Sequence, residues 1–138
     1  MMFRKTITIE TNSECDIVDI TDHVTDAIRT SGISDGLACV FVPHSTAALI
    51  TMENELGLRN DLIRCLERIA PRNANYDHNL AWGDGNGHSH IRSSLLGTSL
   101  TIPFSKGKPE LGTWQQIVLV ELDTRARNRK VIIQIVGE

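Results

Sequence analysis

Leu37-Ala38-Cys39-Val40-Phe41-Val42 is an unbroken apolar run that ends at Pro43. Such a run is typical of a strand that is covered on both faces, so we expect a central, buried strand here. The proline is followed by His44, Ser45 and Thr46, which carry an imidazole and two hydroxyl groups. Because a sheet holds the residues beyond its strand ends rigidly, this segment is part of a candidate site.

The apolar pattern on either side of this run predicts the remaining elements. Alternating or continuous apolar residues predict strands over residues 3–10, 100–104, 117–122 and 131–136. Apolar residues at helical spacing predict a helix from Thr21, as its N-cap, to Gly32, a long helix over 55–70 and a short helix over 91–96. Polar and basic residues predict loops over 72–86 and 125–130.

Length and composition point to one globular domain. The chain has 138 residues, and domains most often have about 100–150. Because the predicted strands and helices mix without a strict βαβ alternation, we expect an α+β fold. The expected architecture is a single compact domain over residues 1–138, with a mixed β-sheet and packed helices.

Charge and hydropathy exclude several classes of protein. A net charge of −3 gives no support for a dominant nucleic-acid-binding surface. No apolar run approaches the roughly 18 residues of a membrane span, and the first residues lack the apolar core of a signal peptide. The widely spaced Cys15, Cys39 and Cys65 contain no C-x-x-C pair, and we expect Cys39 and Cys65 to be small buried hydrophobes. We therefore expect a cytoplasmic protein without nucleic-acid or membrane partners.

The stretch Asp84-Gly85-Asn86-Gly87-His88-Ser89-His90 places two of the five histidines one residue apart. In an extended or looped segment both imidazoles point to one side and can share a metal ion, whereas on a helix they lie about 200° apart. The flanking glycines favour the extended or looped arrangement. Neutral imidazole suits Zn²⁺ and related ions, so a metal site is one interpretation. A solvated loop that leads into a helix is the other.

The same segment suits a phosphate if a helix begins near His90, because the free N–H groups of a helix N-terminus attract anions. Arg92 would add a positive charge there, or be an ordinary solvated helix residue. A Ser45 nucleophile activated by His44 is not favoured, since adjacent residues rarely hydrogen-bond to each other and no G-x-S-x-G elbow is present. His44 is better explained as a metal ligand, a substrate-positioning residue or a plain turn residue.

Three other segments carry candidate side chains. Glu53 precedes the long helix, where it would act as a cap or as a general base. Trp114 lies in a glycine-containing turn with Gln115, and its ring would stack on a ligand or pack in the core. The basic residues of the 125–130 loop are solvated or reach a phosphate on a neighbouring subunit.

These residues together resemble the YjbQ-like family, also labelled UPF0047 or "secondary thiamine-phosphate synthase enzyme". The matching segments occur in family order and are 43–48, 53–54, His78, 84–91, 94–97, 111–115 and 121–123. The resemblance implies a compact α+β subunit that assembles as a homotrimer. It also implies that four histidines, His44, His78, His88 and His90, belong to one site.

The sequence departs from the family pattern at two places. Met52-Glu53-Asn54-Glu55-Leu56-Gly57 stands where the family usually has Asn-Glu-Asn followed by Ala-Asp-Pro, which removes a polar group from the expected edge of the site. The loop after Asp123 lacks the usual Gly-Pro-Arg and is one residue longer. Of Arg125 and Arg127, we assign the place of the family arginine to Arg127.

The resemblance implies a thiamine-phosphate synthase-type enzyme, which couples a hydroxymethylpyrimidine diphosphate to a thiazole phosphate with loss of pyrophosphate. Such a reaction needs cations or N–H groups for the departing diphosphate and a flat surface for the pyrimidine. Two alternatives stay open. One is a metal-dependent hydrolase of a small phosphorylated molecule, in which the metal activates water. The other is a non-catalytic trimer that binds a metal or a small ligand.

The candidate residues fall into three sets. The catalytic set is His44, Glu53 and Asp84. The set that binds a small phosphorylated molecule is Asn86, Arg92, Trp114, Gln115 and Arg127. The set that binds a divalent metal, zinc before magnesium, is His44, His78, His88 and His90.

Overall fold

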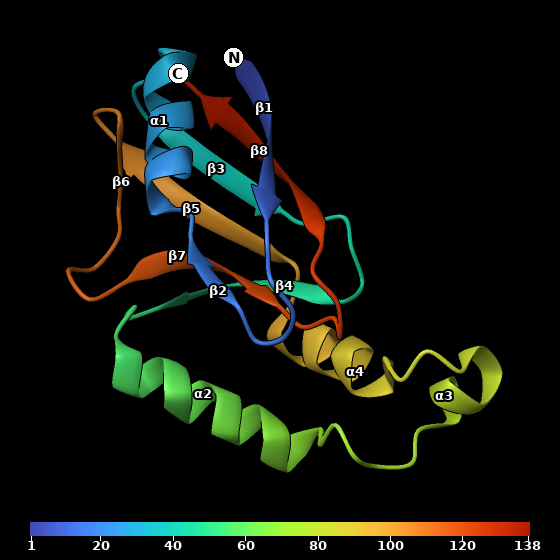
Figure 1. The fold of residues 1–138 in the computed structure, drawn as a ribbon. Helices are drawn as coiled ribbons and strands as arrows, with labels where there is room; N and C mark the ends of the chain where they lie inside the picture. The colour runs from blue at the N-terminus through green and yellow to red at the C-terminus, as the bar shows by residue number, and fades with distance from the viewer.

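A computed structural model describes residues 1–138 and shows two antiparallel sheets and four helices (Figure 1). Sheet A has the strand order β1-β8-β3-β5-β6, formed by Met2–Glu10, Asn128–Gly137, Gly36–Phe41, Ser99–Ser105 and Lys108–Pro109. Sheet B has the order β2-β7-β4, formed by Ile17–Asp19, Gln116–Glu121 and Ala47–Met52. The α+β class is confirmed. The expected mixed sheet is wrong, because every strand pair is antiparallel.

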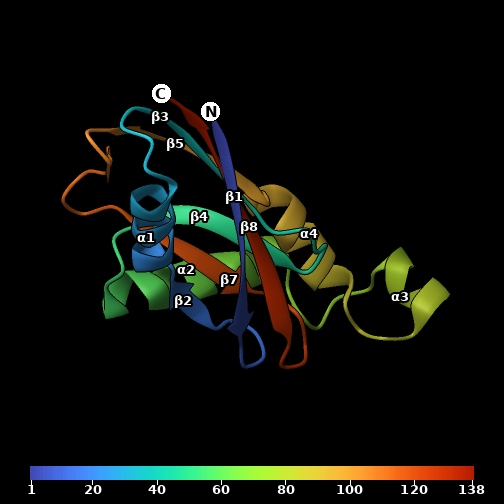
Figure 2. The same cartoon turned by 90° about the horizontal axis from the view of Figure 1, so that it is seen from above.

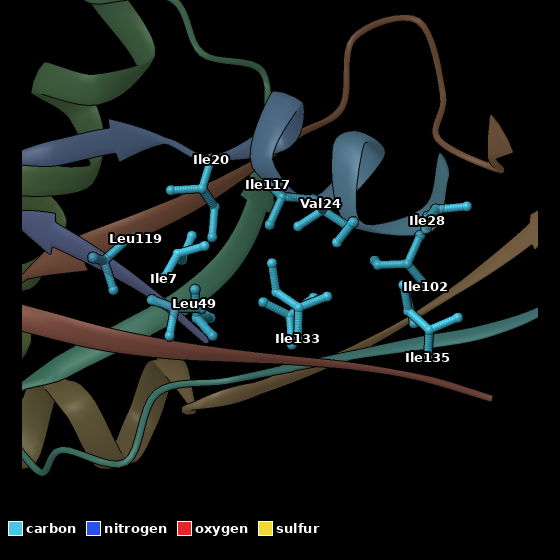
Figure 3. Close-up of a cluster of buried hydrophobic side chains, with 14 of the residues drawn as sticks. Ile7, Ile20, Val24, Ile28, Leu49, Ile102, Ile117, Leu119, Ile133 and Ile135 are labelled. Carbon is cyan, nitrogen blue, oxygen red and sulfur yellow. The ribbon is translucent and has the colours of Figure 1, made fainter. Parts of the chain in front are cut away.

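The main core fills the space between the two sheets (Figure 3). The inward side chains of sheet A, among them Ile133 and Ile135, meet Leu49, Ile117 and Leu119 of sheet B. Helix α1, Thr21–Ser31, closes one side of this space with Val24, Ala27 and Ile28. These side chains are almost entirely buried, so the core supplies the main apolar stabilisation of the fold.

A second, smaller core lies on the outer face of sheet B. Helices α2, Leu56–Ile69, and α4, Gly87–Leu96, lie below this sheet in Figure 1. Leu66 of α2 packs with Ala48, Val118, Val120 and Leu122. Both faces of sheet B are therefore covered, and its central strand β7 is buried from Ile117 to Glu121.

The outer face of sheet A, in contrast, is bare. Leu37, Phe41 and Val136 expose 45%, 38% and 43% of their surface there. The first apolar run does form a central strand, β3, as predicted. The expectation that both of its faces are covered is wrong, because no helix packs on the outer side. Cys39 lies on this face and is half-buried, while Cys65 is exposed on α2, contrary to expectation.

The helices differ from the sequence prediction mainly at their starts. Helix α2 matches the predicted 55–70 helix. Its cap is Glu55, whose carboxylate accepts from the Gly57 and Leu58 N–H groups, and not Glu53. Helix α1 ends at Gly32 as predicted, but Thr21 is its first residue and not its N-cap. Helix α4 begins at Gly87, four residues before the predicted 91–96 helix.

Four elements were not predicted, and the two-residue strand β6 is one of them. Strands β2 and β4 are absent from the sequence-based prediction, because β2 is very short and Ala47–Met52 mixes small, apolar and polar residues without clear alternation. Helix α3, Asp77–Trp82, lies within the predicted 72–86 loop. In Figures 1 and 2 this helix stands away from both sheets, beyond the N-terminal end of α4. No helix is long and apolar enough to cross a membrane.

Candidate functional site

Helix α4 sends its two histidines in different directions. His88 is completely buried, whereas His90 is half-buried and lines a surface pocket. Because each helical residue is rotated by about 100° from the one before it, the side chains of His88 and His90 lie about 200° apart around the helix axis. The expectation of an extended or looped segment that turns both imidazoles toward one metal ion is therefore wrong. The glycines do not extend the loop through the histidines, because Gly87 is itself the first residue of the helix.

His88 belongs to a buried ionic cluster. Its Nε2 lies 2.7 Å from Glu14 Oε2, and Arg72 Nη1 lies 2.9 Å from Glu14 Oε1. Arg92 lies beside the same carboxylate, with Nη1 3.5 Å from Oε2. The cluster joins the loop between β1 and β2 to α4, so His88 has a partner inside the fold.

Arg92 is also committed to the fold. Its Nε donates to the Ala70 carbonyl at 3.0 Å, and its Nη2 donates to the Glu67 carboxylate at 2.8 Å. Cys15 Sγ lies 3.6 Å from Nη1, and burial raises the pKa of this thiol while Arg92 opposes the shift. Arg92 is 2% exposed, so it ties α4 to the C-terminal end of α2 and does not face the surface pocket.

The surface pocket lies between the turn after β3 and the outer side of α4. It has a volume of about 320 Å³ and no apolar side chain in its wall. Its lining residues are His44, Ser45, His90, Ser93, Ser94, Gly97 and Thr98. Ser93 anchors the helix here by donating to the Ala47 carbonyl at 2.6 Å. Imidazoles and hydroxyls supply hydrogen bonds and no apolar contact, so the pocket suits a small polar group.

His44 is held in one orientation by the backbone. The Lys130 N–H lies 3.2 Å from His44 Nε2 and donates to it. A neutral imidazole has one N–H and one acceptor nitrogen, so the proton of His44 lies on Nδ1 in this arrangement. Burial lowers the pKa of His44, and the positive charges of Arg129, Lys130 and Arg127 lower it further, against the opposing effect of Glu121. His44 is therefore a neutral hydrogen-bond donor in a positive local field.

His78 lies beside His90, at the edge of the pocket. The two ring centroids are 4.5 Å apart, and His78 Nδ1 is 3.6 Å from Asp84 Oδ1. Asp84 is exposed and accepts from the Asn86 N–H at 3.1 Å. The chain contains no group of three or more His, Cys, Asp or Glu side chains arranged to hold a metal ion. The four proposed metal-binding histidines therefore do not form a complete ligand set within one chain.

Asn86 and Arg127 meet at a buried carboxylate, Asp123. Asn86 Nδ2 donates to Asp123 Oδ1 at 3.3 Å, and Arg127 Nη2 lies 3.0 Å from Oδ2. Burial alone would raise the pKa of Asp123, but hydrogen bonds from the Arg125 N–H, Thr46, Asn86 and Arg127 hold that pKa below its usual range. This network joins the end of β7 to the start of α4, and it takes up much of the bonding capacity of both candidate residues.

Glu53, Trp114 and Gln115 lie at the other end of sheet B. The register pairs Ala47 with Glu121 at one end of β4 and Met52 with Gln116 at the other. The β4 strand places these ends about 17 Å apart, at roughly 3.3 Å per residue. Figures 1 and 2 likewise show the loop between β6 and β7 on the opposite side of the molecule from α4. One chain thus divides the predicted site residues between two ends.

Sequence reasoning missed several residues of these clusters. Ser93 and Ser94 follow His90 by three and four residues, and this helical spacing would have found them had the helix start been placed correctly. Glu14 and Lys130 reach the histidines from distant strands and loops, with sequence separations of 74 and 86 residues. No local pattern signals such long-range partners.

The chain is similar to known proteins over almost its whole length. A family model described as "UPF0047 protein YjbQ-like" matches residues 5–138. A UPF0047 protein of Methanocaldococcus jannaschii is 40% identical over 131 residues, covering 94% of this chain and 91% of that protein. The UPF0047 protein YjbQ of Escherichia coli is 34% identical over 140 residues, and the match covers 100% of this chain and 100% of that protein. A crystal structure of a protein of unknown function from Sulfolobus solfataricus matches with a TM-score of 0.90, 36% identity and complete coverage of both chains.

Proposed function

The chain belongs to the UPF0047 protein YjbQ-like family, and on that premise we propose that its polar surface pocket binds the phosphate end of a small phosphorylated molecule. The proposal rests on the hydrogen bond and the neutral form of the His44 imidazole. Its Nε2 accepts from the Lys130 N–H, so Nδ1 donates, and nearby cations make the local field positive. A fixed donor in a positive field favours an anion over a metal ion.

The wall of the pocket supplies further donors to an anion. Ser45 and Thr98 contribute hydroxyl groups, and His90 contributes a second imidazole from α4. The volume of about 320 Å³ is at the lower end of small-molecule sites, which suits a phosphate or diphosphate group without a large organic part. Without an apolar wall, this pocket binds only the charged end of its ligand.

The reaction we propose is of the thiamine-phosphate synthase type. A hydroxymethylpyrimidine diphosphate is coupled to a thiazole phosphate: a C–N bond forms at the pyrimidine methylene as its C–O bond to the diphosphate breaks. The electron pair leaves on the pyrophosphate. Hydrogen bonds from His44, Ser45 and His90 would stabilise this developing charge, and such preorganised donors are worth about 10²–10³ in rate.

The test is a coupling assay with both phosphorylated precursors, in which pyrophosphate release and product are measured together. The expected result is turnover by the native protein and a loss of about 10²-fold in His90→Ala. Calorimetry with inorganic pyrophosphate tests the pocket separately. Pyrophosphate binding without turnover would remove the synthase and leave a non-catalytic ligand-binding protein. An absence of binding would remove the pocket as a phosphate site.

A second candidate function is a metal-dependent hydrolase of a small phosphorylated molecule. It is favoured by the proximity of His78, His90 and Asp84, since imidazole and carboxylate are zinc ligands, while magnesium prefers oxygen ligands. These residues do not form a complete ligand set within one chain. The zinc content of the purified protein tests this candidate. About one zinc ion per chain, lost in His78→Ala, would favour it. Metal-free protein that turns over would exclude it.

We further propose that the chain assembles as a homotrimer. The support is the bare outer face of sheet A, where Leu37, Phe41 and Val136 are exposed on neighbouring strands. Contiguous exposed apolar surface is typical of protein–protein interfaces. Sedimentation equilibrium should give three times the monomer mass, and a monomer at micromolar concentration would contradict the proposal.

A further inference from the structure

We propose that a second copy of this chain completes the phosphate pocket by placing its Trp114 end over the histidines. This inference rests on the proposed function, because it names the partner that supplies the missing part of the same site. We call the end of the molecule with His44, His78 and His90 the histidine end. We call the opposite end, with Glu53, Trp114 and Gln115, the tryptophan end.

The pocket is incomplete within one chain. Its wall contains two imidazoles, hydroxyls and a glycine but no apolar side chain and no large aromatic ring. It therefore offers a flat organic ring only the small imidazole faces. Trp114 is the obvious stacking surface, with 74% of its surface exposed, but it lies at the other end of sheet B. Trp114 can therefore reach the pocket only from another chain, whereas the exposed Trp82 on α3 belongs to the histidine end of the same chain.

Both ends carry unusually exposed apolar side chains. At the histidine end, α3 exposes 88% of Leu80 and 75% of Trp82, and α4 exposes 62% of Leu95. At the tryptophan end, Leu56 is 69% exposed in addition to Trp114. Large exposed aromatic and aliphatic side chains are typical of interface cores. The projection of α3 away from the sheets makes it available to a neighbour (Figure 2).

The exposed charges at the two ends include residues of opposite sign. Arg125 and Lys130 at the histidine end are exposed and have no ion-pair partner within the chain. Glu53 and Glu110 at the tryptophan end are likewise exposed and unpaired. Pairing between these basic and acidic residues favours head-to-tail contact, while Asp77 and Asp84 also place negative charge at the histidine end. In that arrangement Glu53, Trp114 and Gln115 join the histidines of the next copy.

Chemical cross-linking between single-cysteine chains tests this contact. Ser94→Cys marks the histidine end and Thr113→Cys marks the tryptophan end, each in a chain that also carries Cys15→Ser, Cys39→Ser and Cys65→Ser. The two differently tagged chains are co-expressed and treated with a short bifunctional maleimide. We expect cross-links between unlike chains, and none when either chain is present alone. Cross-linking of the Thr113→Cys chain with itself, or no cross-link between unlike chains, would overturn the inference.

A second measurement separates the interface from the function. Trp114→Ala should weaken self-association about tenfold or more in sedimentation velocity, while Trp114→Phe retains most of it. Equal self-association in both variants and the native chain would contradict the contact. If the native chain forms the unlike cross-links but does not bind inorganic pyrophosphate, the interface stands and the proposed function falls. If the native chain binds pyrophosphate but does not form those cross-links, the phosphate pocket stands and the proposed interface falls.

Discussion

His88 and His90 stand one residue apart on α4 and have opposite environments. His88 is fully buried and lies 2.7 Å from the Glu14 carboxylate, while His90 is half-buried at the polar pocket beside His78. Helical rotation alone separates them. The comparison teaches that two histidines close in sequence can have different surroundings, one contacting a buried carboxylate and the other lining a surface pocket.

The largest expected effect is on stability at the buried side of α4. His88→Ala removes a buried hydrogen-bond partner of Glu14 and leaves a cavity in its place, while Arg72 and Arg92 still lie beside the carboxylate, and we expect a cost of about 2–5 kcal/mol. Urea unfolding measures the loss. His90→Ala is the matched control on the same helix, and we expect a change within about 0.5 kcal/mol for it. Equal losses in both variants would erase the distinction between the two residues.

The converse effect concerns ligand binding at the exposed side. His90→Ala removes a hydrogen bond to a charged ligand, so the dissociation constant for inorganic pyrophosphate should rise about 10–100-fold. Titration calorimetry measures it. His23→Ala is the control, because His23 is exposed on α1, far along the sequence from the pocket residues. An unchanged affinity in His90→Ala would place the anion elsewhere.

A smaller effect is expected where α4 begins. A methyl group at Gly87 would lie 2.6 Å from Tyr76 Cβ and 2.7 Å from Cγ, so Gly87→Ala must displace the segment that leads into α3. Such overpacking costs about 1–3 kcal/mol. Gly112→Ala is the control, since its nearest neighbour would lie at 3.6 Å. Thermal unfolding of both variants compares them, and equal midpoints would show that the Tyr76 contact is not tight.

The smallest effect concerns acid stability. Hydrogen bonds outweigh burial and lower the pKa of Asp123 in the folded state, so its contribution is complete above the unfolded pKa of about 3.9 and is lost as the pH falls through the folded value. Unfolding free energies measured from pH 6 down to pH 2 should decline. Asp123→Asn should decline less steeply over that acid range. An identical slope in both proteins would mean that Asp123 does not contribute.

Much of the fold could be predicted from the sequence, because apolar spacing reports which side of an element is buried. That spacing identified β1, β3, β5, β7, β8, α1 and α2 with small errors at the ends. It could not show that the outer face of β3 is bare, since an apolar run signals burial by any partner. The start of α4 was misplaced because glycine and polar residues disfavour a helix locally, whereas Ser93 and the Glu14 cluster hold it through distant contacts.

The candidate site could be predicted only in part. His44 and His90 line one pocket and His78 lies beside His90, while the single site of four histidines that the resemblance implies stays a prediction. The sequence could not reveal that His88 turns inward, that the backbone N–H of Lys130 fixes the tautomer of His44, or that Trp114 lies at the other end of sheet B. The inward turn of His88 follows from the start of α4 at Gly87, and the other two facts depend on long-range strand register, which local patterns do not encode.

The most direct test of the difference between His88 and His90 is an NMR titration of the imidazole nitrogens with inorganic pyrophosphate. Signals of His44 and His90 should shift in proportion to occupancy, with the His44 proton on Nδ1 throughout, while the signals of His88 stay in place. Movement of the His88 signals while those of His44 and His90 remain unchanged would contradict the account.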